Sequence, residues 1–169
     1  IHSGQDGIQA QGNISISGWP IIEIDSYEDG IQTRSHFSMS NGELTIHTFE
    51  GYDTLYFDKD TMSAKGIKAT TSDEVTEDAT NTILITGGTI NVDSSDDAIH
   101  SDANLYFTRG TINVRRGADG IHSDSILVIG TENGFERDPE INVLESIEVI
   151  ESGNIYIYSG KVYVKAIDD

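Results

Sequence analysis

The sequence predicts an all-β fold in which short parallel strands stack into a β-helix, or solenoid, of about six coils. One observation is a hexapeptide that returns after 22 residues, as DAIHSD at 97–102 and DGIHSD at 119–124. The other is the alternation of apolar and polar residues over short runs that end at glycines. This alternation is typical of β-strands, whereas a helix would repeat every 3.6 residues.

Weaker copies of the hexapeptide extend the repeat over the whole chain. In each copy an isoleucine follows a position that is usually occupied by the small residue glycine. These positions lie 23, 36, 32, 22 and 29 residues apart in successive copies. A period of about 22 residues explains two of these steps, and the longer ones require loop insertions within 48–62, 71–81 and 131–139. The motif isoleucines are Ile8, Ile31, Ile67, Ile99, Ile121 and Ile150.

Two further alternating pairs follow each motif, so we expect three short strands per coil. One coil cannot bury its own apolar face, but stacked coils form a continuous core. An antiparallel sandwich would also alternate, yet it gives no reason for the same residue at one place in every unit. The pairs expected to face the core in the second strands are Ile14/Ile16, Phe37/Met39, Ile83/Ile85, Leu105/Phe107, Ile126/Val128 and Ile155/Ile157.

The length of 169 residues fits one domain spanning 1–169. Both ends resemble parts of a motif copy. Ile1, His2 and Ser3 match the IHS at the end of the motif, and Asp168 and Asp169 match the acids at its start. We therefore expect the domain to be part of a longer chain, and we expect it to be monomeric.

The chain is strongly acidic, with a formal net charge of −19. This charge argues against nucleic acid or an anionic membrane as a partner, because both are polyanions. It fits a cation, a neutral ligand or an anionic ligand bridged by a cation, and solubility alone is the alternative explanation. The chain has no cysteine, which excludes disulfides and thiolate metal sites, and no apolar run is long enough to span a membrane.

The position before each small motif residue predicts a ladder of charges about 4.8 Å apart. Lys65 lies between Asp29 and Asp97 and is expected to neutralise both, whereas the later acids have no such base. Neighbouring like charges at this spacing cost about 3 kcal/mol at an effective dielectric of 20, which a bound cation would convert into attraction. Oxygen ligands without cysteine favour Ca²⁺, and a solvated acidic edge is the alternative. The ladder comprises Asp6, Asp29, Lys65, Asp97, Asp119, Glu148 and Asp169.

Other outward positions offer candidate contacts for a ligand. His100 and His122 are expected to stack as exposed rungs, too few for a transition-metal site, in one column with Gln9, Gln32, Lys68 and Glu151. A column with Asn91, Asn113 and Asn142 is expected to bond along itself. Tyr106 and Tyr156 offer flat faces for sugar rings. Aromatic residues in loops are candidates for ligand contact or for packing onto the stack: Trp19, Phe49, Tyr52, Tyr56 and Phe57.

Several segments together resemble the secreted carbohydrate-binding β-helix family of clostridia. They are DDAIHSD at 96–102, ADGIHS at 118–123, ITGGTINV at 85–92, AKGIKA at 64–69 and ESIEVIESGNI at 145–155. The sequence departs from the family pattern at Val149, where glycine is usual. The resemblance implies a right-handed, pectate-lyase-like β-helix that acts outside the cell and binds Ca²⁺.

The same resemblance implies non-catalytic binding of plant cell-wall polysaccharides, namely cellulose and acidic polymers such as polygalacturonate (pectin). Polygalacturonate would be repelled by this chain unless cations bridged the two. The acids of the motif copies are the expected metal ligands, and the sugar contacts are expected from Lys65, Lys68, His100, His122, Tyr106 and Tyr156. The expected metal ligands are Asp96, Asp97, Asp102, Asp119, Asp124 and Glu148.

Two alternatives remain open at this stage. A calcium-dependent pectate lyase would need Ca²⁺ to acidify a proton of the sugar and a base to remove it, for which Lys65, Lys68 and Arg34 are available. A cell-surface adhesin would need no sugar site. No nucleophile elbow or phosphate-binding loop occurs in the sequence.

Overall fold

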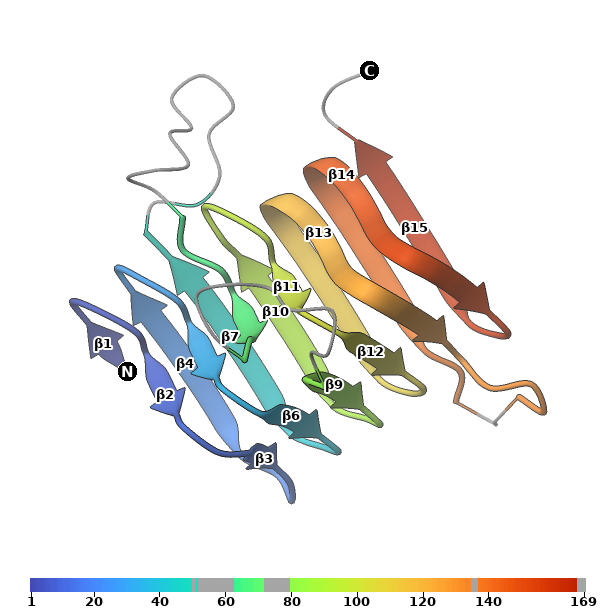
Figure 1. Cartoon of the computed structure of the whole chain (residues 1–169), viewed down its shortest axis with the longest axis horizontal. Coiled ribbons are helices and arrows are strands. Elements are labelled where there is room, and N and C mark those ends of the chain that lie inside the picture. Colours follow the sequence, from blue (N-terminus) through green and yellow to red (C-terminus); the bar gives the residue numbers. More distant parts are fainter. Residues whose placement is uncertain (50, 52–62, 72–79, 135–136, 167–169) are drawn as a thin grey trace.

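The computed structural model describes residues 1–49, 51, 63–71, 80–134 and 137–166. Within these residues all regular structure is β-strand, and every strand pair is parallel. The strands stack side by side along the long axis of the molecule (Figure 1). This arrangement confirms the all-β prediction and is consistent with the predicted β-helix.

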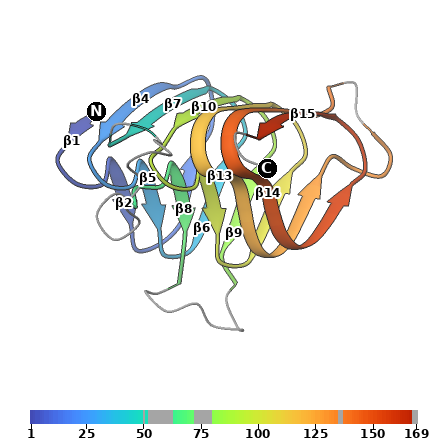
Figure 2. The same cartoon turned by 90° about the horizontal axis from the view of Figure 1, so that it is seen from above.

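The strands form three rows, which follow one another along the chain in each repeat. Row A holds β1 (His2–Ser3), β4 (Ile21–Ser26), β7 (Glu43–Thr48), β10 (Thr89–Asp93) and β15 (Lys161–Ala166). Row B holds β2 (Ile8–Ala10), β5 (Ile31–Thr33), β8 (Ile67–Ala69) and β11 (Ile99–Ser101). Row C holds β3 (Ile14–Ile16), β6 (His36–Met39), β9 (Thr82–Ile85) and β12 (Asn104–Phe107). The long strands β13 (Thr111–Ile129) and β14 (Glu140–Ile157) continue through all three rows (Figure 2).

The predicted register of the motif is confirmed. Each motif isoleucine pairs with the next along row B, from Ile8 with Ile31 to Ile121 with Ile150. Four of them, Ile31, Ile67, Ile99 and Ile121, are fully buried, and together with the inward residues of rows A and C they form one continuous core.

The small residue before each isoleucine is explained by a close approach between repeats. A Cβ atom added to Gly30 would lie 2.7 Å from the carbonyl oxygen of Gly66 and would also collide with Ile46. The backbone N–H and C=O groups at this position form hydrogen bonds to neighbouring repeats. For example, the N–H of Ile31 donates to the carbonyl oxygen of Gly66 at 2.9 Å. Val149, the exception, packs its half-buried side chain against the core.

One predicted core pair is wrong by a single residue. Leu127 and Ile129 face the core, and Ile126 and Val128 face outward. Leu127 pairs with Leu105 and with Ile155, and a bulge between Ser123 and Ile126 places one extra residue in β13 relative to β14. Leu127 lies six residues after Ile121, as Leu105 lies six after Ile99, whereas the prediction placed the pair five residues after the motif isoleucine. Because side chains alternate along a strand, this one residue moves the pair to the other face.

The predicted loop insertions fall largely on residues outside the described ones, including 52–62 and 72–79. Tyr52, Tyr56 and Phe57 also lie outside the described residues. Across the described ranges there is no helix with the length and apolarity that a membrane crossing would need.

Candidate functional site

The outer face of row B carries a charged column where the sequence places it. Gln9, Gln32, Lys68, His100, His122 and Glu151 are paired in register from β2 to β14. The acids of the motif copies lie on both sides of this column. The later residues of this column, together with the acids and the lysine that are connected to them through ion pairs, are called the charged ladder. It consists of Lys65, Asp96, Asp97, His100, Asp102, Asp119, His122, Asp124 and Glu151.

Each histidine of the charged ladder is held between two acids of its own repeat. His100 Nδ1 lies 2.8 Å from Asp97 Oδ2, and His100 Nε2 lies 3.2 Å from Asp102 Oδ1. His122 Nδ1 lies 3.0 Å from Asp119 Oδ2, and His122 Nε2 lies 3.0 Å from Asp124 Oδ1. We call this arrangement, with acids three residues before and two after the histidine, an acid–histidine–acid clamp.

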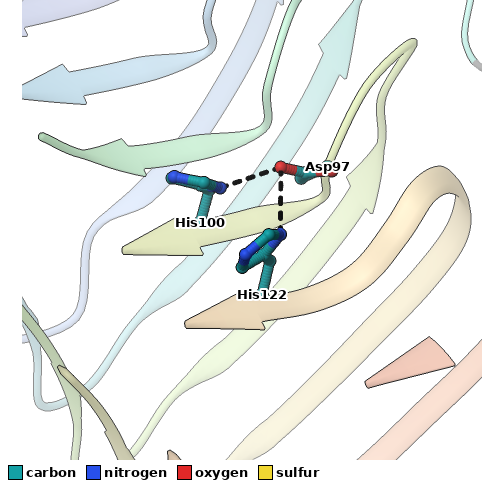
Figure 3. A group of neighbouring side chains, drawn as sticks. All are labelled: Asp97, His100 and His122. Atoms are coloured by element: carbon teal, nitrogen blue, oxygen red, sulfur yellow. Dashed lines mark hydrogen bonds and ion pairs between the residues drawn. The ribbon is translucent and has the colours of Figure 1, made fainter. Parts of the chain in front are cut away.

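The two clamps also contact each other. The imidazole rings are tilted against each other with centroids 4.7 Å apart, and Asp97 Oδ2 contacts both, at 2.8 Å from His100 Nδ1 and 3.8 Å from His122 Nδ1 (Figure 3). Glu151 of the next repeat lies 3.4 Å from His122 Nδ1. With Lys65 bonded to Asp97 from the preceding repeat, the charged ladder is one connected network across four repeats, rather than a set of independent surface residues.

The neighbouring acids raise the pKa of both histidines above its ordinary value. The hydrogen bond to Asp119 raises the pKa of His122 to about 9 against the opposing effect of burial, with further help from the charges of Asp97 and Glu151. Burial alone would lower the pKa of His100, but its bonds to Asp102 and Asp97 raise it. His122 is thus an imidazolium at neutral pH and donates from both ring nitrogens.

Lys65 supplies the third positive charge of the network. Its Nζ lies 2.7 Å from Asp96 Oδ2 and 2.5 Å from Asp97 Oδ2, and its side chain is only 12% exposed. Burial opposes the charged form, but Asp97 and Asp96 outweigh it and raise the pKa of Lys65. Burial likewise opposes ionisation of Asp97, yet the bond from His100 and the charge of Lys65 lower the pKa of this carboxyl.

Three details of the sequence prediction are corrected by this network. Lys65 does not neutralise Asp29 with its amine, because only its backbone N–H donates to Asp29 Oδ1, at 2.8 Å. The predicted pairing of Lys65 with Asp97 is confirmed, but Asp119, which was expected to lack a base, pairs with His122. The histidines are not exposed rungs, because the side chains of His100 and His122 are 12% and 21% exposed. The sequence argument counted only one base and treated histidine as neutral.

The six expected metal ligands occupy different environments. Asp96, Asp97 and Asp102 are buried, and Asp102 also accepts bonds from Thr70 Oγ1 and the Thr71 N–H. Asp119 and Asp124 are partly exposed, and Glu148 is exposed and paired in register with Asp119. Asp169 lies outside the described residues. Three groups of side chains offer ligand atoms within 4.8 Å of one another: Asp97/His100/His122, His100/Asp102/Asp124 and Asp119/His122/Glu151.

The remaining predicted contact residues are spread over the surface. Lys68 Nζ lies 3.3 Å from Asp29 Oδ2. Tyr106 and Tyr156 share a column of row C with Val128 between them, so the predicted spacing of one repeat is confirmed. Tyr156 is exposed, and its ring stacks with that of Tyr158 at a centroid distance of 6.3 Å.

A second polar surface follows the outer face of row A. Asn113 Nδ2 donates to Asn91 Oδ1 at 2.8 Å, and Asn142 Nδ2 donates to Asn113 Oδ1 at 2.9 Å, as the sequence predicted. This asparagine ladder (Asn91, Asn113 and Asn142) lines a groove of about 620 Å³. His47, Asp93, Arg115 and Leu144 also line the groove, and the sequence pattern had not brought them together with the asparagines.

The clamps were visible in the sequence as the repeated pattern Asp-x-x-His-x-Asp, but their role was not. In a strand, positions two apart face the same side, which places Asp102 beside His100 and Asp124 beside His122. The contacts of Asp97 and Asp119 depend on the bend that precedes the strand. Glu151 was missed as a partner, because it reaches His122 from the next repeat.

These features define a repetitive all-β protein with parallel stacked strands and continuous polar columns on its outer faces. The chain belongs to the family of carbohydrate-binding domain-containing proteins, whose model matches residues 1–120. No curated protein and no solved structure matches the chain.

Proposed function

We propose that the protein is a non-catalytic module that binds plant cell-wall polysaccharide outside the cell. The observation that carries this proposal is the match of residues 1–120 to a carbohydrate-binding family, on a fold that repeats its outer side chains along one axis. A polysaccharide is itself a linear repeat, and a parallel stack presents equivalent groups about every 4.8 Å along its length. Cellulose and polygalacturonate are the ligands we propose, as the sequence resemblance implies.

Calcium is proposed as the ion that allows an acidic polymer to bind this acidic chain. Carboxylate oxygens are suitable Ca²⁺ ligands, and Asp119, Asp124 and Glu148 are the proposed ligands that solvent reaches. Binding at Asp96, Asp97 or Asp102 would require Ca²⁺ to replace the bonds from Lys65 and His100. The imidazole nitrogens are poor ligands for Ca²⁺, so the carboxylates would have to supply the coordination.

Binding is tested by retention on insoluble cellulose and on immobilised polygalacturonate, with Ca²⁺ and with a chelator. We expect retention on both polymers, with the chelator releasing the protein only from polygalacturonate. Asp119→Asn combined with Asp124→Asn should weaken retention on polygalacturonate, whereas Glu145→Gln, an exposed acid away from the clamps, should not. Failure to retain the protein on any polysaccharide would favour the adhesin alternative.

Calcium binding itself is measured by calorimetric titration and by thermal melting with and without chelator. No heat and no shift in Tm would reject the calcium proposal. The lyase alternative is tested separately, by absorbance of unsaturated product from polygalacturonate with Ca²⁺. Of its three candidate bases, Lys65 and Lys68 are ion-paired with aspartates, which favours binding without turnover, whereas Arg34 is exposed.

A further inference from the structure

The turns between rows C and A form a groove that neither ladder includes. It has a volume of about 750 Å³ and runs along one long edge of the stack, below β3, β6, β9 and β12 in Figure 1. Backbone bonds tie successive turns together: Glu43 N to Pro20 O at 2.8 Å, Thr89 N to Gly42 O at 3.0 Å and Glu140 N to Gly110 O at 3.0 Å. The turns from Trp19 to Asp138 lie four strand spacings apart, or about 19 Å. We call this surface the corner groove.

Glycine backbone forms part of the lining of the corner groove. Gly42, Gly88 and Gly110 have φ angles of 97°, 91° and 103°, which side-chain-bearing residues rarely adopt. A Cβ atom on the neighbouring Gly87 would collide with the carbonyl oxygen of Ser40. The glycines therefore let successive turns stack closely, and they add backbone groups to a lining that also carries Trp19, Glu43 and Arg109.

Trp19 stands at one end of the groove and is 85% exposed. Another aromatic residue that the sequence placed in a loop behaves differently, because Phe49 packs against Tyr27 with ring centroids 4.9 Å apart. An indole left in water forgoes the gain of burying a large apolar surface, and such side chains commonly serve in recognition. Its flat face is suited to the C–H face of a pyranose ring.

The charge of the groove differs from that of the whole chain. Its charged lining residues are Arg109, Arg137, Glu43 and Asp138, whose formal charges sum to zero on a chain with a net charge of −19. A neutral polymer avoids the long-range repulsion that an acidic polymer would meet on this protein. The polar lining offers hydrogen-bond donors and acceptors for sugar hydroxyls.

From these observations we infer that the corner groove binds a neutral polysaccharide strand, with a sugar ring stacked on Trp19. This inference rests on the proposed carbohydrate binding and gives it a place, a residue and a ligand class. It separates neutral glucan, bound at the corner groove without metal, from acidic polymer, bound at the charged ladder with Ca²⁺.

The intrinsic fluorescence of the protein provides a direct test, because Trp19 is the only tryptophan in the chain. Titration of the whole chain with a soluble β-1,4-glucan oligosaccharide in chelator should shift the emission to shorter wavelength and saturate. Polygalacturonate oligosaccharide in the same buffer should leave the emission unchanged. An unchanged emission at glucan concentrations that saturate retention would overturn the inference.

Variants provide the second test, with circular dichroism to confirm folding. Trp19→Ala should reduce affinity for cellulose at least tenfold and leave Ca²⁺-dependent retention on polygalacturonate as it was, and Trp19→Phe should recover part of the loss. Tyr163→Ala removes an aromatic ring on row A that is also exposed, at 57%, and should bind as the wild type does. Cellulose binding by Trp19→Ala at wild-type affinity would sink the inference and leave the proposed function standing. A wild-type protein that binds no polysaccharide would overturn both.

Discussion

In row B, the side chain that contacts the motif aspartate is a glutamine in the first two repeats and a histidine in the fourth and fifth repeats. In the first two, Gln9 Nε2 donates to Asp6 Oδ2 at 2.9 Å and Gln32 Nε2 donates to Asp29 Oδ2 at 3.1 Å. In the later two, His100 and His122 contact the acid at the same offset, three residues earlier. The strands pair in register in both regions, so the two regions differ here in the identity of the side chain and not in the backbone.

This difference in the contacting side chain accompanies opposite pKa shifts of the aspartates. Burial and the charge of Asp29 raise the pKa of Asp6, because glutamine gives a hydrogen bond and no positive charge. In the later region the pKa of Asp97 is lowered, although burial opposes ionisation, because His100 and Lys65 are positively charged. The comparison shows that both kinds of neighbour fit the column, and that the pKa of a buried acid is lowered where cations lie beside it.

Removing the most buried cation should have the largest effect. Lys65→Met leaves Asp96 and Asp97 buried without their ammonium partner, so we expect a loss of about 3–5 kcal/mol in the free energy of unfolding. Urea denaturation measures this loss, and Lys165→Met, an exposed lysine of β15, is the matched control. Equal stability of the two variants would contradict the compensating role of Lys65.

Converting a later repeat to the earlier chemistry should change the pH dependence. The pKa of His122 is raised to about 9 from 6.5, so its contribution is complete below pH 6.5 and is lost as the pH rises through 9. Between pH 6 and pH 10 the wild type should lose about 1–3 kcal/mol more than His122→Gln, below the unscreened limit because the ring is partly solvated.

The measurement is urea denaturation at both pH values, in chelator so that divalent ions do not contribute. His36→Gln replaces an exposed histidine of β6 and should keep the wild-type pH dependence. A wild type and a His122→Gln variant with the same loss would show that the clamp does not stabilise the imidazolium.

The reverse conversion, Gln32→His, should have a smaller effect. It creates a contact with Asp29, but position 34 is Arg34 instead of an acid, so only half of a clamp forms. We expect a gain of about 0.5–1 kcal/mol at pH 5 relative to pH 8, because the new imidazole is charged only at the lower pH. Thermal melting at both pH values checks this, with Gln11→His in a solvent-exposed position as the control.

The smallest effect is expected at the exposed start of the column. Gln9→Ala removes bonds to Gln32 Oε1 and Asp6, but this side chain is exposed and water can replace it. The free energy of unfolding should change by less than about 0.5 kcal/mol. A larger loss in urea denaturation would mean that the amide pair is as important as the clamps.

Much of the fold followed from the repeat alone. The six motif isoleucines, the inward pairs of row A and the asparagine ladder all lie where the period places them, because equivalent residues of a parallel stack become neighbours. The pair Leu127 and Ile129 was missed because the run 126–129 is apolar at every position, so alternation cannot tell which pair faces the core.

The sequence by itself determined the stacking, the columns and the acids that gather beside the motif. Only the tertiary structure decided which cation neutralises which acid, and that the turns leave a neutral groove beside an exposed tryptophan. The physical reason is that the period fixes backbone positions, whereas ion pairing, burial and grooves depend on how far each side chain reaches and on what the next repeat places against it.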